Sequence, residues 1–292
     1  MTRLEDGKLR IAVQNSGRLT EPSLELLSGA GLEFDSYSRR LFSSVRNFDL
    51  DILFLRDDDI PEYVQDGISD LGIVGRNLAV ERGAEVTELE ALGFGHCRLV
   101  LAVPRESAIH TPRDLAGRRV ATSYPRSLRL FLDREGIEAT IVQLRGATEI
   151  APALDVADAI CDLVSTGSTL RTNDLVPLQT ILESQAVLIA SPGALRSPER
   201  AGAIERILVR LRGLLNARRT KYVMINAPLE AVPRIRAVLP GLRSPTLVPL
   251  ADPGYVAFHA AISEERFWEV AERIKAAGGT EVLVLPVEKL LL

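Results

Sequence analysis

Residues 50–75, LDILFLRDDDIPEYVQDGISDLGIVG, decide the fold class of this chain. Residues 50–55 form an uninterrupted apolar run, which is typical of a buried strand. Ile60 and Val64 then lie on one side of a short helix that Gly67 ends, and residues 70–75 form a second strand. A strand, a helix and a strand in succession predict a parallel sheet.

The same alternation continues on both sides of this stretch. Before it, residues 9–14 (LRIAVQ) form an apolar strand. A helix follows, with Thr20 as its N-cap, Pro22 in its first turn, and Gly29 and Gly31 at its end. After it, the pattern predicts strands at 118–123, 140–144 and 159–164, and helices at 128–134 and 149–156. These later segments indicate a second α/β lobe.

Two further apolar strands, at 98–103 and 185–190, flank this second lobe. The chain thus crosses from one lobe to the other and back again. Two such crossings predict two lobes joined by a hinge, with a cleft between them. A long amphipathic helix that begins at Ser197 and Pro198 ends the second crossing. We therefore assign residues 1–97 and 187–217 to lobe I and residues 98–186 to lobe II.

From residue 218 onward the order of the elements changes. The pattern predicts a strand, a helix, two strands, a helix and a strand, at 222–226, 232–239, 246–249, 255–262, 267–277 and 281–287. This βαββαβ order, complete in about 75 residues, is that of a ferredoxin-like unit. We assign residues 218–292 to a separate domain.

The composition excludes several classes of protein. The chain has 292 residues, of which 46% are apolar and 25% charged, so neither disorder nor a single small module is expected. Its 35 basic and 39 acidic side chains leave a net charge of −4, which does not favour binding to nucleic acid or to an acidic membrane. No apolar run approaches the roughly 18 residues that span a bilayer, and the segment MTRLEDGKLR contains no apolar signal core. With two cysteines that lack metal-ligand spacing, we expect a cytoplasmic protein.

Residues 157–170, ADAICDLVSTGSTL, carry the strongest local indication of chemistry. Small residues after a strand let several backbone N–H groups converge on one point, and hydroxyl groups and the positive end of a following helix add to an anion site. The carboxylate of Asp162, just before this loop, can accept hydrogen bonds from the hydroxyls of a ribose. A capped turn is the alternative. The candidate phosphate-binding residues are Ser165, Thr166, Gly167, Ser168 and Thr169.

A second polar cluster, Arg56 with Asp57, Asp58 and Asp59, follows the strand at 50–55. The carboxyl ends of parallel strands line the ligand crevice of an open α/β sheet, where three carboxylates can serve a metal ion or a ribose. The alternative is the amino end of a helix, which favours acidic residues, and we expect Asp59 to act as that helix cap.

Two more turns lie at the same edge of the predicted sheet. Ser16-Gly17-Arg18 follows the first strand, where the arginine can fork onto a phosphate or stack on a base. Gly75-Arg76-Asn77 follows the strand at 70–75. Both are also compatible with tight turns that carry solvated charges. The histidines have no spacing typical of a zinc site or a catalytic triad, and we expect structural roles for His96, His110 and His259.

Motifs in a fixed order extend over nearly the whole chain: VQNSGRL at 13–19, FLRDDDIPEYVQDGISDLGIVG at 54–75, ATSYP at 121–125, GATEIAP at 146–152 and ADAICDLVSTGSTL at 157–170. Together they resemble the ATP phosphoribosyltransferase family, which catalyses the first step of histidine biosynthesis. The βαββαβ unit is similar to the regulatory domain of the long form of that family. The resemblance implies an α/β fold with a two-lobed, periplasmic-binding-protein-like catalytic core and a ferredoxin-like regulatory domain.

The resemblance also implies a glycosyltransferase reaction. N1 of the adenine of ATP would join C1 of 5-phosphoribosyl 1-diphosphate, which releases diphosphate and forms N1-(5-phosphoribosyl)-ATP. Because such a reaction needs stabilisation of the leaving group and no covalent nucleophile, Mg²⁺ bound to the diphosphate is the expected cofactor. We assign no metal ligands within the chain.

By the same resemblance, the cleft residues divide between the two substrates. Those expected to bind 5-phosphoribosyl 1-diphosphate are Glu149, Asp162 and the loop Ser165, Thr166, Gly167, Ser168 and Thr169. Those expected to face ATP are Arg18, Asp57, Gly75 and Tyr124. The expected catalytic residues are Arg18, Asp57, Glu149 and Asp162.

The open sheet face of a ferredoxin-like unit must be covered, so we expect pairing with other copies of the chain, in an assembly between dimer and hexamer. The resemblance implies that histidine binds to this domain and inhibits the enzyme, with Asn226, Ser244 and Thr246 as candidate contacts. The alternative for the whole chain is a two-lobed module that binds a small anion without reacting with it.

Overall fold

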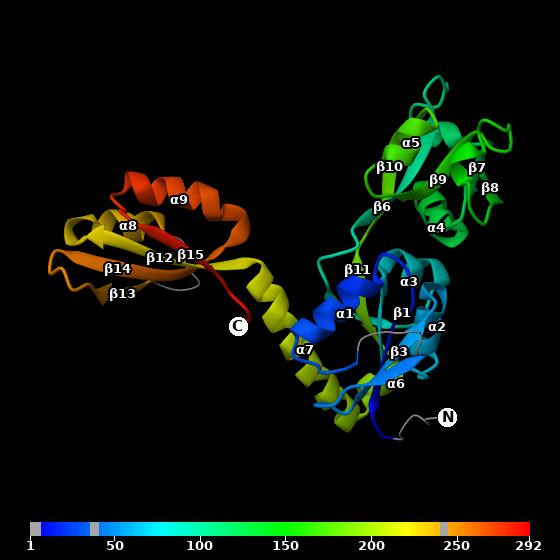
Figure 1. Cartoon of the computed structure of the whole chain (residues 1–292). Coiled ribbons are helices and arrows are strands. Elements are labelled where there is room, and N and C mark those ends of the chain that lie inside the picture. Colours follow the sequence, from blue (N-terminus) through cyan, green and yellow to red (C-terminus); the bar gives the residue numbers. More distant parts are fainter. Residues whose placement is uncertain (1–6, 36–40, 240–244) are drawn as a thin grey trace. The chain divides into compact units, whose positions relative to one another are not determined.

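The computed structural model describes residues 7–35, 41–239 and 245–292 (Figure 1). These residues form two compact units. The first comprises Met1–Ser28 with Leu32–Ile204, and the second comprises Gly29–Gly31 with Glu205–Leu292. Within the described part of the chain, every helix is too short or too polar to cross a membrane.

A six-stranded sheet forms the core of what we call the first lobe of the first unit. Its strand order is β2 (Phe42–Ser44), β3 (Leu50–Leu55), β1 (Leu9–Gln14), β4 (Leu71–Gly75), β11 (Ala186–Ala190) and β5 (Thr87–Ala91). Its helices are α1 (Thr20–Gly29), α2 (Ile60–Gln65), α3 (Arg76–Arg82) and α6 (Pro192–Arg196). Ile60 and Val64 of α2 pack against Ala12 and Val74, as the helical spacing in the sequence predicts.

The predicted parallel pairing is confirmed for the three strands that indicated it, but the complete sheet of this lobe is mixed. Strands β1, β3 and β4 are parallel, but β11 is antiparallel to both β4 and β5, and β2 is antiparallel to β3. The reason is non-local, because β11 enters the sheet on the return from the second lobe and not through a helical crossover. The short strands β2 and β5 were not predicted.

A five-stranded sheet forms the core of the second lobe. Its strand order is β10 (Leu175–Ser184), β6 (Cys97–Pro104), β9 (Ala159–Val164), β7 (Arg119–Thr122) and β8 (Thr140–Gln143). Strands β7, β8 and β9 are parallel, whereas β6 is antiparallel to β9 and to β10. The helices are α4 (Pro125–Glu135) and α5 (Ser168–Thr172). Strand β10 was not predicted.

The helix expected at 149–156 does not form. In its place the structure has a single 3₁₀ turn, Thr148–Ile150, followed by irregular backbone. Pro152 has no N–H to donate, and Asp155 has a φ of 54°, which the interior of a right-handed helix does not contain. Glu149 is therefore held on a turn.

The chain passes from the first sheet to the second between β5 and β6, and it returns at Gln185 between β10 and β11. The long helix predicted from Pro198 is α7 (Pro198–Arg218), and the division between the compact units falls inside it. The domain boundaries at 97/98, 186/187 and 217/218 stay a prediction.

The second unit contains the predicted βαββαβ order. Its strands are β12 (Thr220–Pro228), β13 (Thr246–Pro249), β14 (Tyr255–Ser263) and β15 (Val282–Pro286), and its helices after α7 are α8 (Val232–Val238) and α9 (Phe267–Ala276). The sheet order is β13-β14-β12-β15, and every pairing is antiparallel. Figure 1 shows α8 and α9 on the same side of this sheet. Phe258, Val223 and Ile225 pack beneath the helices, so the α/β core with a ferredoxin-like unit is confirmed.

Candidate active site

The loop predicted to bind phosphate follows β9 in the second lobe. It lines a cavity of about 410 Å³ together with Asp162 and Glu149, so the structure brings this predicted set together. The side chains of Ser165, Thr166, Ser168 and Thr169 are exposed, and Thr166 Oγ1 lies 3.1 Å from Ser168 Oγ. Four hydroxyl groups around one cavity can donate to the oxygens of a phosphate.

The helix after this loop is shorter than we expected. Helix α5 has five residues, Ser168–Thr172, and the macrodipole of so short a helix is small. The hydroxyls and backbone groups of the loop are therefore the main candidates for binding an anion.

Asp162 lies half-buried on β9, and its Oδ1 accepts a hydrogen bond of 2.7 Å from the N–H of Leu163. Burial raises the pKa of this carboxyl because the charged form loses water, and the nearby Glu149 carboxylate raises it further, whereas the Leu163 N–H acts in the opposite direction. Hydrogen-bond donors or a cation supplied by a ligand would stabilise the charged form.

Arg18 reaches this loop from the first lobe. It lies in the turn between β1 and α1, and its Nη1 donates a hydrogen bond of 2.8 Å to Ser165 Oγ. Gly17 makes the turn possible, because it has a φ of 133° and a Cβ at this position would lie 2.5 Å from Gln14 Nε2. The structure therefore places the guanidinium beside the predicted phosphate loop.

Gln14, the last residue of β1, was not predicted as part of the site. Its Nε2 donates to Asp57 Oδ2 at 3.1 Å, and its Oε1 accepts from the N–H of Leu19 at 3.1 Å. Gln14 thus connects Asp57 to the turn that holds Arg18. A polar residue at the carboxyl end of a buried strand is a signal by which sequence reasoning could have found it.

The three acidic residues after β3, Asp57, Asp58 and Asp59, have different surroundings. Asp57 accepts from Gln14 and from the Asp58 N–H, and Asp58 forms an ion pair of 3.3 Å with Arg82. Asp59 occupies the N-cap position of α2, but its side chain makes no capping hydrogen bond, so the expected capping role is wrong in that respect. Among the described residues, no group of three or more His, Cys, Asp or Glu side chains is arranged to hold a metal ion.

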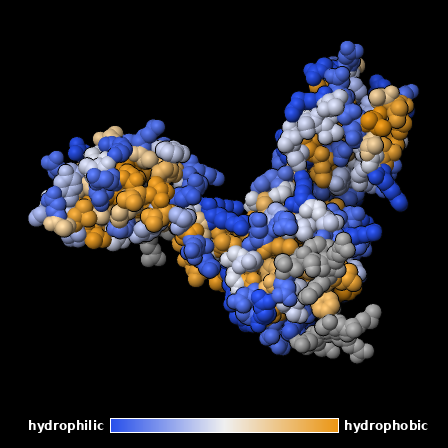
Figure 2. Space-filling view, in the orientation of Figure 1, coloured by the Kyte–Doolittle hydropathy of each residue, from blue (hydrophilic) through white to orange (hydrophobic). Residues whose placement is uncertain are grey.

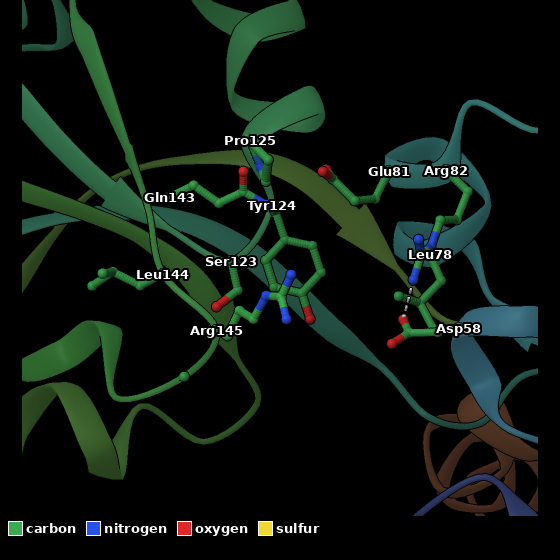
Figure 3. A pocket seen from close by; sticks show the side chains of 11 residues that line it. Asp58, Leu78, Glu81, Arg82, Ser123, Tyr124, Pro125, Gln143, Leu144 and Arg145 are labelled. Carbon is green, nitrogen blue, oxygen red and sulfur yellow. Dashed lines mark ion pairs between the residues drawn. The ribbon is translucent and has the colours of Figure 1, made fainter.

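A second cavity, of about 560 Å³, lies between the two lobes (Figure 3). The first lobe contributes Asp58, Leu78, Glu81 and Arg82, and the second contributes Ser123, Tyr124, Pro125, Gln143, Leu144, Arg145 and Gly146. Of the residues expected to face ATP, Tyr124 lines this cavity, whereas Arg18 contacts the phosphate loop. Gly75 ends β4 and precedes α3, and neither it nor Asp57 is among the residues that line the cavity.

Gln143 and Arg145, which sequence reasoning missed, come at and just after the carboxyl end of β8. Because β8 is parallel to β7, that position lies on the edge where open α/β sheets bind ligands. Asp57 was predicted because it follows a parallel strand, and the same reasoning applied to β8 would have identified Gln143 and Arg145.

Tyr124 lies among the carboxylates of both lobes. Burial raises the pKa of its phenol, and the charges of Asp162, Asp58 and Asp57 raise it further, because each disfavours a phenolate. The Tyr124 hydroxyl therefore stays protonated at neutral pH and can donate a hydrogen bond to a ligand.

The candidate regulatory residues belong to the second unit. Asn226 lies on β12, and its Oδ1 is buried without a hydrogen-bond partner. Thr246 is exposed at the start of β13, opposite His259 of β14. The pairing registers place Asn226 and Thr246 on the same sheet face, with β14 between their strands. Ser244 lies outside the described residues.

A hydroxyl-rich loop with two carboxylates in one lobe, an arginine from the facing lobe and a second polar cavity define a class of protein. It is a two-lobed α/β protein whose hydroxyl groups and arginine suit a phosphorylated ligand, and whose second cavity offers space for another ligand.

Comparisons with known proteins identify the family. A family model described as ATP phosphoribosyltransferase matches residues 56–213, and one described as the HisG C-terminal domain matches residues 217–289. A curated ATP phosphoribosyltransferase from Cytophaga hutchinsonii is 44% identical over 282 residues, which cover 97% of this chain and 98% of the relative. A chain of the solved ATP phosphoribosyl transferase (HisG:HisZ) complex from Thermotoga maritima is 25% identical, with a TM-score of 0.59 over 70% of this chain and 98% of that chain. The chain belongs to the ATP phosphoribosyltransferase family.

The recognised resemblance is therefore confirmed, and so is the prediction of an enzyme. The chain is a pentosyltransferase of histidine biosynthesis. The alternative, a two-lobed module that binds an anion without reaction, is set aside because the family match includes both the two-lobed core and the C-terminal domain.

Proposed function

We propose that the chain joins N1 of the adenine of ATP to C1 of 5-phosphoribosyl 1-diphosphate, and that Asp162 and the loop from Ser165 to Thr169 hold the phosphoribosyl group. The observation that carries this proposal is the single cavity that these residues line together with Glu149. The loop hydroxyls bind the 5-phosphate, and Asp162 accepts hydrogen bonds from the ribose hydroxyls.

In the reaction, the bond between C1 and the diphosphate oxygen breaks, and its electron pair leaves with the diphosphate. The lone pair of adenine N1 forms the new bond to C1, which carries positive charge in the transition state. The side chain of Arg18, 2.8 Å from Ser165 Oγ, supplies positive charge beside the phosphoribosyl site, where it stabilises the negative charge on the leaving group. Carboxylates at Asp162 and Glu149 favour the developing positive charge on the ribose.

This route needs no covalent nucleophile from the chain. Cys97 and Cys161 are both buried, and burial raises the pKa of the Cys161 thiol, so neither side chain is exposed to a substrate. The role of the chain is to align two substrates and to stabilise charge.

We assign the second cavity to ATP. Its volume of about 560 Å³ suits a nucleotide, the ring of Tyr124 offers a stacking surface for adenine, and Arg82 and Arg145 offer positive charge to a triphosphate. Asp57 and Gly75 lie at the carboxyl ends of β3 and β4, outside the lining of this cavity, and their expected roles toward ATP stay a prediction.

Magnesium is the expected metal. Oxygen ligands suit this hard cation, and the Asp162 and Glu149 carboxylates face the cavity proposed for the diphosphate substrate. When bound with that substrate, the ion would neutralise charge on the leaving group. With the ion bound, these two carboxylates would still orient the substrate by accepting hydrogen bonds from its hydroxyl groups.

We further propose that histidine inhibits the enzyme through the second unit and that copies of the chain assemble through its open sheet face. Tyr222, Leu283 and Leu285 share this face and are 40%, 48% and 46% exposed, and Figure 2 displays apolar residues grouped on the surface of this unit. Such a surface favours association. The unpartnered Oδ1 of Asn226 can accept from the ammonium group of an amino acid.

The test of the reaction is incubation of the full chain with ATP, 5-phosphoribosyl 1-diphosphate and Mg²⁺. We expect an absorbance change from the N1-substituted adenine and one diphosphate released per adduct. Omission of either substrate is the control. Release of diphosphate without the adenine adduct would contradict the proposal.

A further inference from the structure

Glu81 makes a contact between the lobes that the proposed reaction does not use. It lies near the end of α3 in the first lobe, and its carboxylate accepts three hydrogen bonds from the amino end of α4 in the second. The N–H of Arg126 donates to Oε1 at 2.9 Å, and the N–H and Oγ of Ser127 donate to Oε2 at 2.8 and 2.7 Å. Both oxygens of one carboxylate thus contact the opposite lobe.

Helix α4 lacks a cap of its own, which explains why this contact forms. Its N-cap residue is Tyr124, whose side chain makes no capping hydrogen bond, and Pro125 at its first position has no N–H. The next two N–H groups, of Arg126 and Ser127, need acceptors, and Ser127 is buried. Glu81 supplies those acceptors, and its negative charge suits the positive end of the helix.

A second feature brings the same two helices together. Gly83 follows the last residue of α3 and has a φ of 59°, and a Cβ there would lie 2.3 Å from Cζ of Arg126. The guanidinium of Arg126 therefore packs directly on the backbone at residue 83. A glycine is required at this position both for its conformation and for the close approach.

We propose that Glu81 is a positioning residue that holds the two lobes at the separation the ATP cavity needs. Glu81 itself lines that cavity, and its partners begin two residues after Tyr124, while Asp58 and Arg82 lie on its own side (Figure 3). Holding α4 against α3 therefore fixes the distance from Tyr124 to the first-lobe side of the cavity. This inference rests on the proposed assignment of the cavity to ATP.

The walls of the phosphoribosyl cavity do not depend on this contact. All the residues that line it belong to the second lobe, from Glu149 to Leu170, so a change in the separation at α3 and α4 leaves its walls intact. Arg18 reaches its loop from the first lobe, but its proposed role is in the transition state, so a displaced Arg18 would lower kcat more than it would change the KM for 5-phosphoribosyl 1-diphosphate. The two substrates should therefore respond differently when Glu81 is altered.

The experiment compares E81Q, E81D and the control E135Q in the full chain. Gln keeps the size of the side chain, but its amide presents a donor to one of the two backbone N–H groups. We expect E81Q to raise the KM for ATP about tenfold or more, since hydrogen bonds to a charged group are lost, and to change the KM for 5-phosphoribosyl 1-diphosphate less than about twofold. E81D, which keeps the charge on a shorter side chain, should fall between E81Q and the wild type.

Glu135 is a matched control because it lies at the other end of α4 and pairs with Arg134 of the same helix. We expect E135Q to behave as the wild type. Hydrogen exchange of the peptide that contains residues 124–130 gives a readout independent of turnover. The amides of residues 126 and 127 should exchange faster in E81Q and at the wild-type rate in E135Q.

The proposal is overturned if E81Q leaves the KM for ATP unchanged, if it raises both KM values equally, or if E135Q has the same effect. If E81Q does not fold, S127A removes one of the three bonds, and a rise of about twofold to fivefold in the KM for ATP alone is then the supporting result. If the wild type forms no product, the proposed reaction fails, and exchange rates together with calorimetric ATP binding decide the role of Glu81.

Discussion

The carboxylate of Asp162 illustrates how single residues in the site combine binding with a cost in stability. Burial raises its pKa, so the folded chain holds a proton on this group more readily than the unfolded chain does. At neutral pH the ionised form lowers stability until a ligand supplies donors. Gln14 and Glu81 differ from Asp162, because groups within the chain already supply their hydrogen-bond partners and no ligand is needed.

The first prediction concerns binding by Asp162 and Thr166. D162N and T166V should each weaken the interaction with 5-phosphoribosyl 1-diphosphate by roughly tenfold to a hundredfold, since D162N replaces a charged acceptor with an amide and T166V removes a hydroxyl. ATP binding should change little. Steady-state kinetics with each substrate varied in turn provide the measurement, and unchanged constants in both variants would rule out the assignment of this loop.

The second prediction concerns stability and pH at the same residue. Because the folded pKa of Asp162 is raised, stability falls as pH rises from the unfolded pKa, about 3.9, through the folded value. D162N should therefore increase Tm at pH 7, with a gain that shrinks toward pH 4. Asp158 is the control of opposite sign: its hydrogen bonds to Arg119 lower its pKa, so D158N should decrease Tm at pH 7 and lose that effect at low pH. A lower Tm for D162N at pH 7 would refute the argument.

At the scale of elements, turns from different lobes assemble the site. The turn after β1 brings Arg18 to the loop after β9, and the turn at Thr148–Ile150 brings Glu149 to the same cavity. Positions such as these depend on the conformation of a few turn residues, so a change in one turn should affect the site without unfolding either sheet.

The third prediction tests the first of these turns. G17A places a Cβ 2.5 Å from Gln14 Nε2 at a φ of 133°, so Gln14 must move away from Asp57. We expect kcat/KM to fall about tenfold or more. G117A is the control, because Gly117 has a φ of 72° and no atom within 4 Å of a Cβ. It should cost about 1 kcal/mol of stability and leave the kinetics unchanged. Equal kinetic effects in both variants would contradict the role of the turn.

At the scale of the whole molecule, two compact units contain different candidate sites. The first contains both cavities, and the second contains the open sheet face and Asn226. Each unit buries its own apolar residues in a separate core, so catalysis and the proposed regulation would depend on different parts of the chain.

The fourth prediction concerns metal. Because the described residues contain no group of three or more side chains arranged for a metal ion, Mg²⁺ should arrive with the substrate. The purified chain should contain no stoichiometric metal by elemental analysis, and excess chelator should abolish activity until Mg²⁺ is restored. Full activity in chelator would exclude the proposed role of the ion.

The fifth prediction concerns regulation. Deletion of residues 218–292 should abolish inhibition by histidine and weaken assembly, while the remaining chain still binds ATP. In the full chain, N226A should reduce inhibition without loss of basal activity, because it removes the buried acceptor from the second unit and leaves the cavities of the first unit unchanged. Inhibition assays and sedimentation provide the measurements. If the truncated chain is inhibited as strongly as the full chain, histidine acts elsewhere.

Local patterns in the sequence were enough to predict most of the secondary structure and one part of the candidate site. The periodicity at residues 50–75, the hydroxyl-rich loop after residue 164 and the βαββαβ order after residue 218 were all predictable, because side-chain spacing and turn residues act within a few positions of one another. The family could be recognised for the same reason, since its motifs are short and contiguous.

Only the tertiary structure decided which of these pieces meet. Arg18 and Ser165 are 147 residues apart in sequence, and no local pattern pairs them. Glu81 caps a helix 45 residues away, and β11 pairs antiparallel to β4, which precedes it by more than a hundred residues. Such contacts depend on how lobes fold back on each other, which is set by burial over the whole core, so the partners of Gln14, Arg18 and Glu81 emerge only once the chain is folded.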